Sequence, residues 1–184
     1  MKKIILSAIA IMALGTAAQA QDSGIKVGIH LGLPIGDAGD FYSFNAGADI
    51  AYLWNVAEGL NVGVTTGYTH FVAKDADEVA EDLGGPGLED LFEDLLGDDV
   101  RIFDDAGFIP VAATATYSLS DSFFIGADLG YAIYAGSGEG DSGVYYQPKF
   151  GWQSESIEVF ASYKGIAVDG ITLSTVGIGA AYKF

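Results

Sequence analysis

Cysteine is absent from the 184-residue chain, which excludes a disulfide framework, a thiolate metal site and the acylated N-terminal cysteine of a lipoprotein. Proline is scarce, with 4 residues, whereas glycine is abundant, with 26. That balance suits many closely packed strands and argues against disorder. After the N-terminal segment no apolar run approaches the length of about 20 residues that a spanning helix needs.

Basic residues are also few, with 8 against 25 acidic ones and a net charge of −17. Lys2 and Lys3 precede the apolar stretch "IILSAIAIMALG", and the small-residue pattern "AQA" follows at 18–20. This order predicts a cleaved signal peptide over 1–20 and a mature domain over 21–184. Cleavage would leave six basic residues against 25 acidic ones, a net charge of −19. Such a surface repels phosphate, so we expect no nucleic-acid partner, whereas divalent cations or basic partners are compatible with it.

Alternation of apolar and small or polar residues dominates the mature chain and predicts eight strands. They are expected at 25–33, 44–54, 60–71, 108–117, 123–134, 144–152, 157–165 and 171–184. Most are close to the length with which a tilted strand crosses a bilayer. Short connections ("NVAEG", "SLSDS", "QSES") alternate with longer ones, of which "IAVDG" is the least pronounced. The pattern predicts an all-β, eight-stranded antiparallel up-and-down transmembrane barrel, with short turns in the periplasm and long loops outside.

The two faces of these strands predict lipid outside the barrel and a crowded lumen inside. One face is bulky and apolar, and aromatic residues gather near both of its ends, as two interfacial girdles would require. The girdle residues are Trp54, Tyr117, Phe123 and Trp152 near the short turns, and Phe44, Tyr68, Tyr131, Tyr146 and Tyr163 near the loops. The other face carries glycine, alanine, threonine and a few charged residues.

Charged residues on the inward face predict a lumen network. Its members are Lys26, Asp49, Asp128, Lys149, Glu158, Lys164 and Lys183. An eight-stranded barrel is just wide enough for its side chains to fill it, and an unpaired buried charge is costly. We therefore expect buried ion pairs, with Glu158 meeting Lys26 and Lys183 near the periplasmic end. A gated ion or proton path through the same charges is the alternative.

Two prolines interrupt this scheme. Pro110 and Pro148 fall inside expected strands, although a closed barrel has no edge at which a missing N–H donor is harmless. Each is expected to mark a β-bulge or a strand end.

The segment 73–107 differs from the rest of the chain and holds 13 of the 25 acidic residues. Leucine and phenylalanine at helical spacing predict a short amphipathic helix over 87–97. It either is part of a solvated loop or presents an apolar face to an extracellular partner. The order of acidic residues does not match an EF-hand, so only diffuse binding of divalent cations is expected.

With its signal peptide, eight strands and terminal "YKF", the chain resembles the small outer-membrane β-barrel family, which includes OmpA-like and OmpX-like barrels and "porin family" proteins. "FIPVAATATYSL" and "FFIGADLGYAIY" are similar to two consecutive strands of that family. The resemblance covers about 21–184 and implies the bacterial outer membrane as location. It also implies a C-terminal signal for the barrel-assembly machinery. That signal would consist of Phe184, Tyr182, Ala180, Ile178 and Val176.

Three functions remain compatible with the sequence. The first is a structural or surface-interaction barrel, expected to be a monomer without cofactors, in contact with outer-membrane lipid and lipopolysaccharide. The second is a narrow porin-like channel. The third is a membrane-embedded lipid-modifying enzyme, for which His70 with the adjacent Thr69 and the loop acids is the candidate constellation, His30 being inward.

Overall fold

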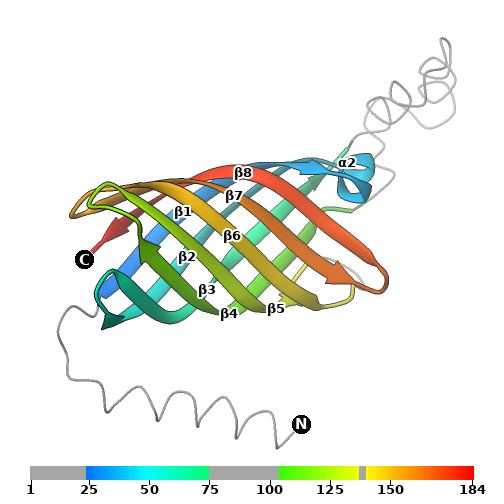
Figure 1. Ribbon diagram of the computed structural model, residues 1–184. Coiled ribbons are helices and arrows are strands. Elements are labelled where there is room, and N and C mark those ends of the chain that lie inside the picture. The colour runs from blue at the N-terminus through cyan, green and yellow to red at the C-terminus, as the bar shows by residue number, and fades with distance from the viewer. Residues whose placement is uncertain (1–23, 75–103, 137–139) are drawn as a thin grey trace, which may run out of the picture.

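The computed structural model describes residues 24–74, 104–136 and 140–184 of the chain. The expected signal peptide over 1–20, the expected helix over 87–97 and most of the acidic loop lie outside these residues. The described residues form a closed antiparallel barrel in which each strand pairs with its sequence neighbours and β1 pairs with β8 (Figure 1). The fold predicted from the alternating pattern is confirmed.

The ends of the eight strands lie within about three residues of the expected ones. They are β1 (Gly24–Ile35), β2 (Tyr42–Ala57), β3 (Leu60–Ala73), β4 (Ala106–Ser118), β5 (Phe123–Tyr134), β6 (Gly143–Gln153), β7 (Ile157–Val168) and β8 (Ile171–Lys183). β1 begins and β8 ends at the same end of the barrel, where Lys26 pairs with Lys183. We call this end the termini end, and the opposite one, which carries helix α2 (Asp37–Phe41), the loop end.

One predicted connection is wrong. "IAVDG" was expected to be a longer loop, but β7 continues through Val168, which pairs with Ile171. Only Asp169 and Gly170 remain as the turn, both with positive φ, of 41° and 90°. Two successive residues of this kind make the tight turn whose twist matches a β-hairpin. The alternation of short and long connections therefore fails at the loop end of this hairpin.

Both prolines stay inside their strands without a bulge. Pro110 pairs with Ala132 of β5, while the β3–β4 ladder is interrupted between Thr66↔Val111 and Thr69↔Phe108 and resumes in the same register. Pro148 pairs with Ala127 of β5, and the β6–β7 ladder is interrupted beside it in the same way. Each proline thus removes ladder pairing on one side only, and the predictions of a bulge or a strand end are wrong.

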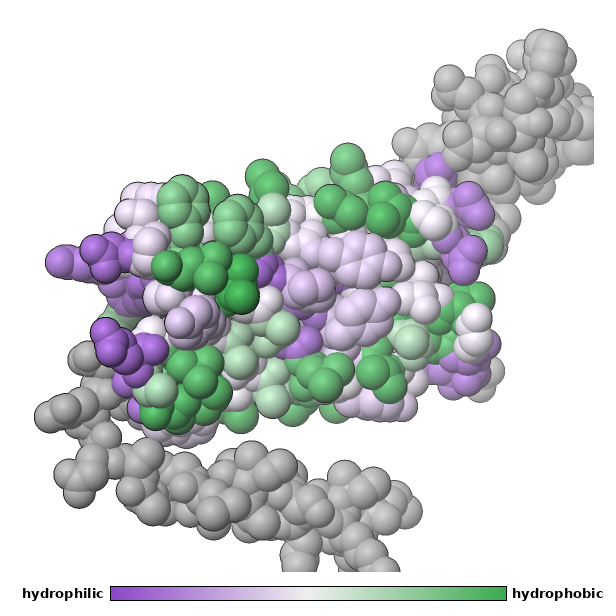
Figure 2. Space-filling model, viewed as in Figure 1, coloured by the Kyte–Doolittle hydropathy of each residue, from purple (hydrophilic) through white to green (hydrophobic). Residues whose placement is uncertain are grey.

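The outside of the barrel is apolar. Large hydrophobic side chains are exposed along every strand, among them Ile29, Leu129 and Ile178, each more than 60 % exposed. Figure 2 shows hydrophobic residues along the barrel wall and hydrophilic residues gathered toward its two ends. Such a surface would be unfavourable in water and suits a hydrocarbon solvent. Among the described residues, no helix is long and apolar enough to cross a membrane.

Substitution of a lipid-facing residue at mid-height should cost more than the same substitution near an end. For Ile178→Arg, which lies near the middle of β8, we expect a loss of about 2–4 kcal/mol of folding free energy in phospholipid vesicles, measured by urea unfolding. For Ile157→Arg, at the start of β7, the loss should be about 1 kcal/mol or less. Equal losses at the two positions would contradict a transmembrane orientation.

The barrel lumen as the candidate functional site

Three charged residues meet inside the termini end of the barrel. The Lys26 ammonium donates to Glu158 Oε2 at 2.7 Å, and Lys183 Nζ lies 3.9 Å from Glu158 Oε1. The Glu158 side chain is almost completely buried, whereas that of Lys183 is 28 % exposed. Strand register produces the meeting, because Lys26 pairs with Lys183 across the β1–β8 closure and Glu158 pairs with Ala181 on β8.

A second ion pair lies between β5 and β6. Lys149 Nζ is 2.6 Å from Asp128 Oδ2, and the Asp128 side chain is buried. Asp128 Oδ1 has no hydrogen-bond partner among the described residues. Beside this pair, the Tyr145 hydroxyl donates to Gln147 Oε1 and Gln147 Nε2 donates to Ser162 Oγ.

A third polar group is a cluster of five side chains from β1, β2, β3 and β7. Asp49 Oδ2 lies 2.8 Å from His30 Nδ1, and Lys164 Nζ lies 2.6 Å from His30 Nε2. Lys164 also donates to Thr69 Oγ1 at 2.9 Å and to Asn45 Oδ1 at 3.1 Å. An imidazole that donates from Nδ1 to the carboxylate and accepts at Nε2 from the ammonium satisfies both contacts. We call these residues the His30 cluster.

Within the His30 cluster the order Asp49–His30–Thr69 is that of an acid, a base and a hydroxyl nucleophile, with His30 Nε2 3.2 Å from Thr69 Oγ1. The hydroxyl is not free to react, however, because it accepts from Lys164 and from Asn45 Nδ2. Thr69 is only 1 % exposed, so a substrate has no access to it. The arrangement is therefore a satisfied polar core, in which each buried group has its partner.

Of the candidate constellation around His70, one loop acid, Asp105, lies beside the imidazole, but Thr69 does not. His70 faces outward, where Nε2 lies 3.3 Å from Asp105 Oδ2 and Nδ1 lies 3.3 Å from the Tyr68 hydroxyl. Thr69 faces into the lumen, as successive residues of a strand must point to opposite faces. His70 and Thr69 therefore cannot act on one substrate, and that prediction is wrong.

At the loop end a single apolar layer fills the lumen. Six strands each contribute the inward residue that lies two positions from their loop end: Phe71, Phe108, Ala132, Tyr145, Ile166 and Leu173. β1 and β2 contribute no residue at that position, but Ala38 of α2 is completely buried in the same cluster and Tyr42 of β2 packs against it. We call this layer, with Ala38, the apolar seal.

The predicted lumen network lacked the apolar seal and three members of the His30 cluster, His30, Asn45 and Thr69. The expected inward face was small and charged, yet Phe71, Tyr145 and Ile166 are among the largest fully buried side chains. The alternation along each strand does indicate that these side chains point inward, because the residues next to them point outward. Asn45 gave no signal, since a lone amide in a strand does not indicate a partner.

The predicted aromatic girdle residues lie on the outer surface. Tyr117, Phe123, Trp152, Phe44, Tyr68 and Tyr131 are exposed, and Trp54, Tyr146 and Tyr163 are partly exposed. The rings of Tyr146 and Tyr163 lie 6.0 Å apart across the β6–β7 pair. The residues named for the C-terminal signal, Val176, Ile178, Ala180, Tyr182 and Phe184, also face outward and are exposed. Among the described residues, no group of three or more His, Asp or Glu side chains could hold a metal ion.

Replacing Glu158 should destabilise the barrel, because its carboxylate is the one that Lys26 and Lys183 share at the termini end. For Glu158→Gln we expect a loss of about 2–3 kcal/mol in vesicle-based urea unfolding, because Lys26 is left mostly buried without its carboxylate. The double variant Lys26→Met/Glu158→Gln should recover most of this loss, since the lysine that remains, Lys183, is partly exposed to water. Lys183→Ala is the control and should cost about 1 kcal/mol or less, because its contact is long and partly exposed. A loss for Lys183→Ala as large as for Glu158→Gln would contradict this assignment.

Comparisons with known proteins find the same architecture but no sequence family. No protein-family model and no curated protein matches the sequence. The crystal structure of Ail, the attachment invasion locus protein of Yersinia pestis, is similar with a TM-score of 0.51 and 17 % identity, over 88 % of this chain and 97 % of that one. The backbone structure of the outer membrane protein Ail in a nanodisc gives a TM-score of 0.53 and 15 % identity, over 89 % and 100 %. A designed transmembrane β-barrel gives 0.50 and 11 %, over 90 % and 99 %. The chain therefore has the fold of the eight-stranded outer-membrane β-barrels represented by Ail.

Proposed function

We propose that this chain is an integral outer-membrane barrel that does not conduct, and that it acts as a structural or surface-interaction protein through its loop end. The observation that carries the proposal is the apolar seal. Its residues close the lumen with side chains that are between 0 % and 6 % exposed. An apolar layer as buried as this one offers an ion no polar path. The free-energy cost of desolvating the ion would therefore be prohibitive.

The apolar exterior supports the membrane location, and the outer-membrane fold shared with Ail supports the bacterial outer membrane. In this proposal, residues 1–20 are removed as a signal peptide and the outward residues from Val176 to Phe184 are read by the barrel-assembly machinery. The barrel stands as a monomer in contact with membrane lipid and lipopolysaccharide. A monomer is consistent with the closed ladder, which leaves no strand edge that needs a partner.

The loop end is strongly acidic. Its described residues include Asp37 and Asp40 of α2, Asp104, Asp105, Asp141 and Asp169, and the remaining acids of 73–107 continue from it in the sequence. Charge complementarity favours a basic partner surface and its rapid association. We therefore propose an extracellular partner with a basic face, bound through the loop 73–107. No catalytic step is part of the proposal, because the hydroxyl of the His30 cluster is inaccessible.

Reconstitution should separate this proposal from the narrow-channel alternative. We expect the folded protein to migrate differently on SDS gels before and after boiling, and to give no conductance steps in planar bilayers. Phe71→Ala/Tyr145→Ala removes the two largest fully buried residues of the apolar seal and should make steps appear. Val159→Ala, on the lipid-facing side, is the control. Conductance by the unaltered protein would refute the filled lumen, and identical migration before and after boiling would refute the membrane barrel.

The role of the loop has its own test. Intact barrel and a variant lacking 75–103 should capture different sets of surface proteins, and partners lost with the loop should dissociate at about 0.5 M salt, where electrostatic attraction is screened. Replacing the acids of this segment by Asn and Gln should have the same effect as deletion. An unchanged set of partners would remove the loop from the proposal and leave the barrel assignment intact.

A further inference from the structure

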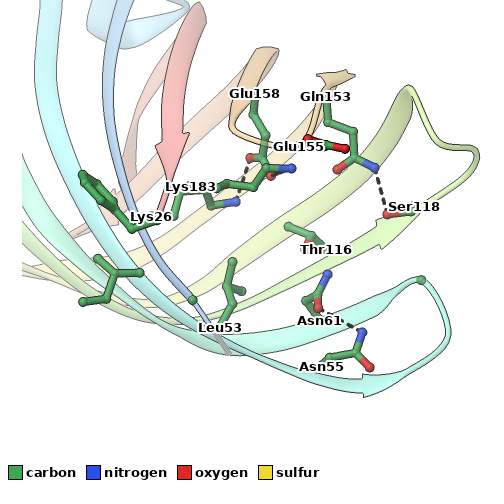
Figure 3. A pocket seen from close by; sticks show the side chains of 14 residues that line it. Lys26, Leu53, Asn55, Asn61, Thr116, Ser118, Gln153, Glu155, Glu158 and Lys183 are labelled. Carbon is green, nitrogen blue, oxygen red and sulfur yellow. Dashed lines mark hydrogen bonds and ion pairs between the residues drawn. The ribbon is translucent and has the colours of Figure 1, made fainter. Parts of the chain in front are cut away.

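The termini end of the lumen is hollow, in contrast to the loop end. A cavity of about 450 Å³ opens there, and Figure 3 shows the polar side chains around it. Asn55, Asn61 and Gln153 present amides, and Thr116 and Ser118 present hydroxyl groups. The charged members are Lys26, Lys183, Glu155 and Glu158. The volume is sufficient for many water molecules or for a small organic solute.

An adjoining cavity of about 640 Å³ shares Asn61, Gln153 and Lys183 with the first and extends over the turns. Each of the three turns at this end adds one carboxylate to the walls: Glu58, Asp121 and Glu155. Together with Glu158, four carboxylates face two lysines across the two cavities. Glu158 compensates the charge of Lys26 in an ion pair, so the electrostatic potential at the mouth of the cavities is negative and favours cations.

Deeper in the lumen, a second polar region lies beyond the buried apolar cluster of Phe124, Phe160 and Ala181, and neither cavity reaches it. Thr116 lines the cavity although only 8 % of its surface is exposed. Two residues farther along the same inward face of β4, which is about 7 Å, Thr114 pairs with Asp128. Asp128 is 2 % exposed, and its Oδ1 atom has no partner among the described residues. A buried carboxylate oxygen without a protein donor is normally hydrated.

The polar region ends at the His30 cluster and the apolar seal. Asn45, Thr69 and Lys164 are each at most 3 % exposed and bind one another. Thr175, which pairs with Lys164 on β8, is 2 % exposed and lies one inward position below Leu173 of the apolar seal. None of these residues lines either cavity.

We propose that the lumen is a blind aqueous vestibule, open only at the termini end, which admits small hydrophilic cations as far as Thr116. The proposal rests on the proposed membrane barrel with a sealed loop end. It adds a binding space for solutes on the side opposite to the extracellular loops. In the outer membrane this space would face the periplasm.

Cysteine labelling can test the vestibule directly, because the chain contains no cysteine of its own. Single variants are reconstituted in vesicles and treated from outside with the membrane-impermeant cation MTSET. Ser120→Cys reports the termini end and Asp169→Cys reports the loop end, so that together they give the fraction of barrels in each orientation. Thr116→Cys is the test position. Thr175→Cys is its matched control, because its hydroxyl also lacks a partner among the described residues and the substitution removes no hydrogen bond.

We expect Thr116→Cys to be labelled to the same fraction as Ser120→Cys, and Thr175→Cys to stay unlabelled until the protein is denatured. No labelling at Thr116→Cys would overturn the vestibule. Labelling that follows Asp169→Cys would overturn its orientation, and labelling at Thr175→Cys would overturn its blind end. If both reporters react completely without lysis of the vesicles, the barrel is not inserted, and the proposed function fails first.

A second arm tests the preference for cations. The ratio of labelling rates for MTSET and the anionic reagent MTSES at Thr116→Cys should fall about fivefold when Glu58, Asp121 and Glu155 are replaced by Gln and Asn. The same ratio at Asp169→Cys, at the other end of the barrel, should not change. An unchanged ratio at Thr116→Cys would refute cation preference.

Discussion

Closure of the β1–β8 ladder is the constraint on which the rest of the structure depends. In hydrocarbon each unpaired backbone group costs several kcal/mol, so the sheet must leave no edge. The register that closes it, from Lys26↔Lys183 to Ile35↔Ser174, also decides which side chains meet inside. Glu158 contacts both lysines because this closure brings β1 beside β8, with β7 as the next neighbour. The lumen charges are thus a consequence of closure as much as of composition.

Closure of an eight-stranded sheet also leaves a lumen that is just wide enough for side chains to fill it. Two kinds of side chain fill this lumen. Paired charges and amides, with the buried rings of Phe124 and Phe160 among them, occupy the lumen from the termini end to its middle. An apolar layer occupies the loop end, where α2 supplies Ala38. The helix is therefore a component of the apolar seal, although the sequence indicated only a loop there.

Much of the fold could be predicted from the sequence because the signals were local. Alternation assigned strand faces, and turn residues placed the hairpins to within a few residues. The β7–β8 turn was misjudged because Ile166, Ala167 and Val168 carry no break in the alternation, and only tertiary pairing shows that they continue the strand. Pro110 and Pro148 were misjudged for a related reason. A proline removes one donor, and a barrel strand tolerates the loss when the pairing on its other side is intact.

The site was less predictable because it depends on distances across the lumen. Lys164 and His30 are 134 residues apart in sequence, and no local pattern links them. For function, the consequence is that the two ends of the barrel differ. The lumen opens into a polar cavity at the termini end and is closed by an apolar layer at the loop end, and each end carries an acidic surface. The two ends are therefore chemically independent. In the proposed function the loop end engages a partner without opening the lumen, and in the proposed vestibule a solute that enters at the termini end meets a closed wall before it reaches the loops. The molecule is organised as two separate surfaces held at a fixed distance by the barrel between them.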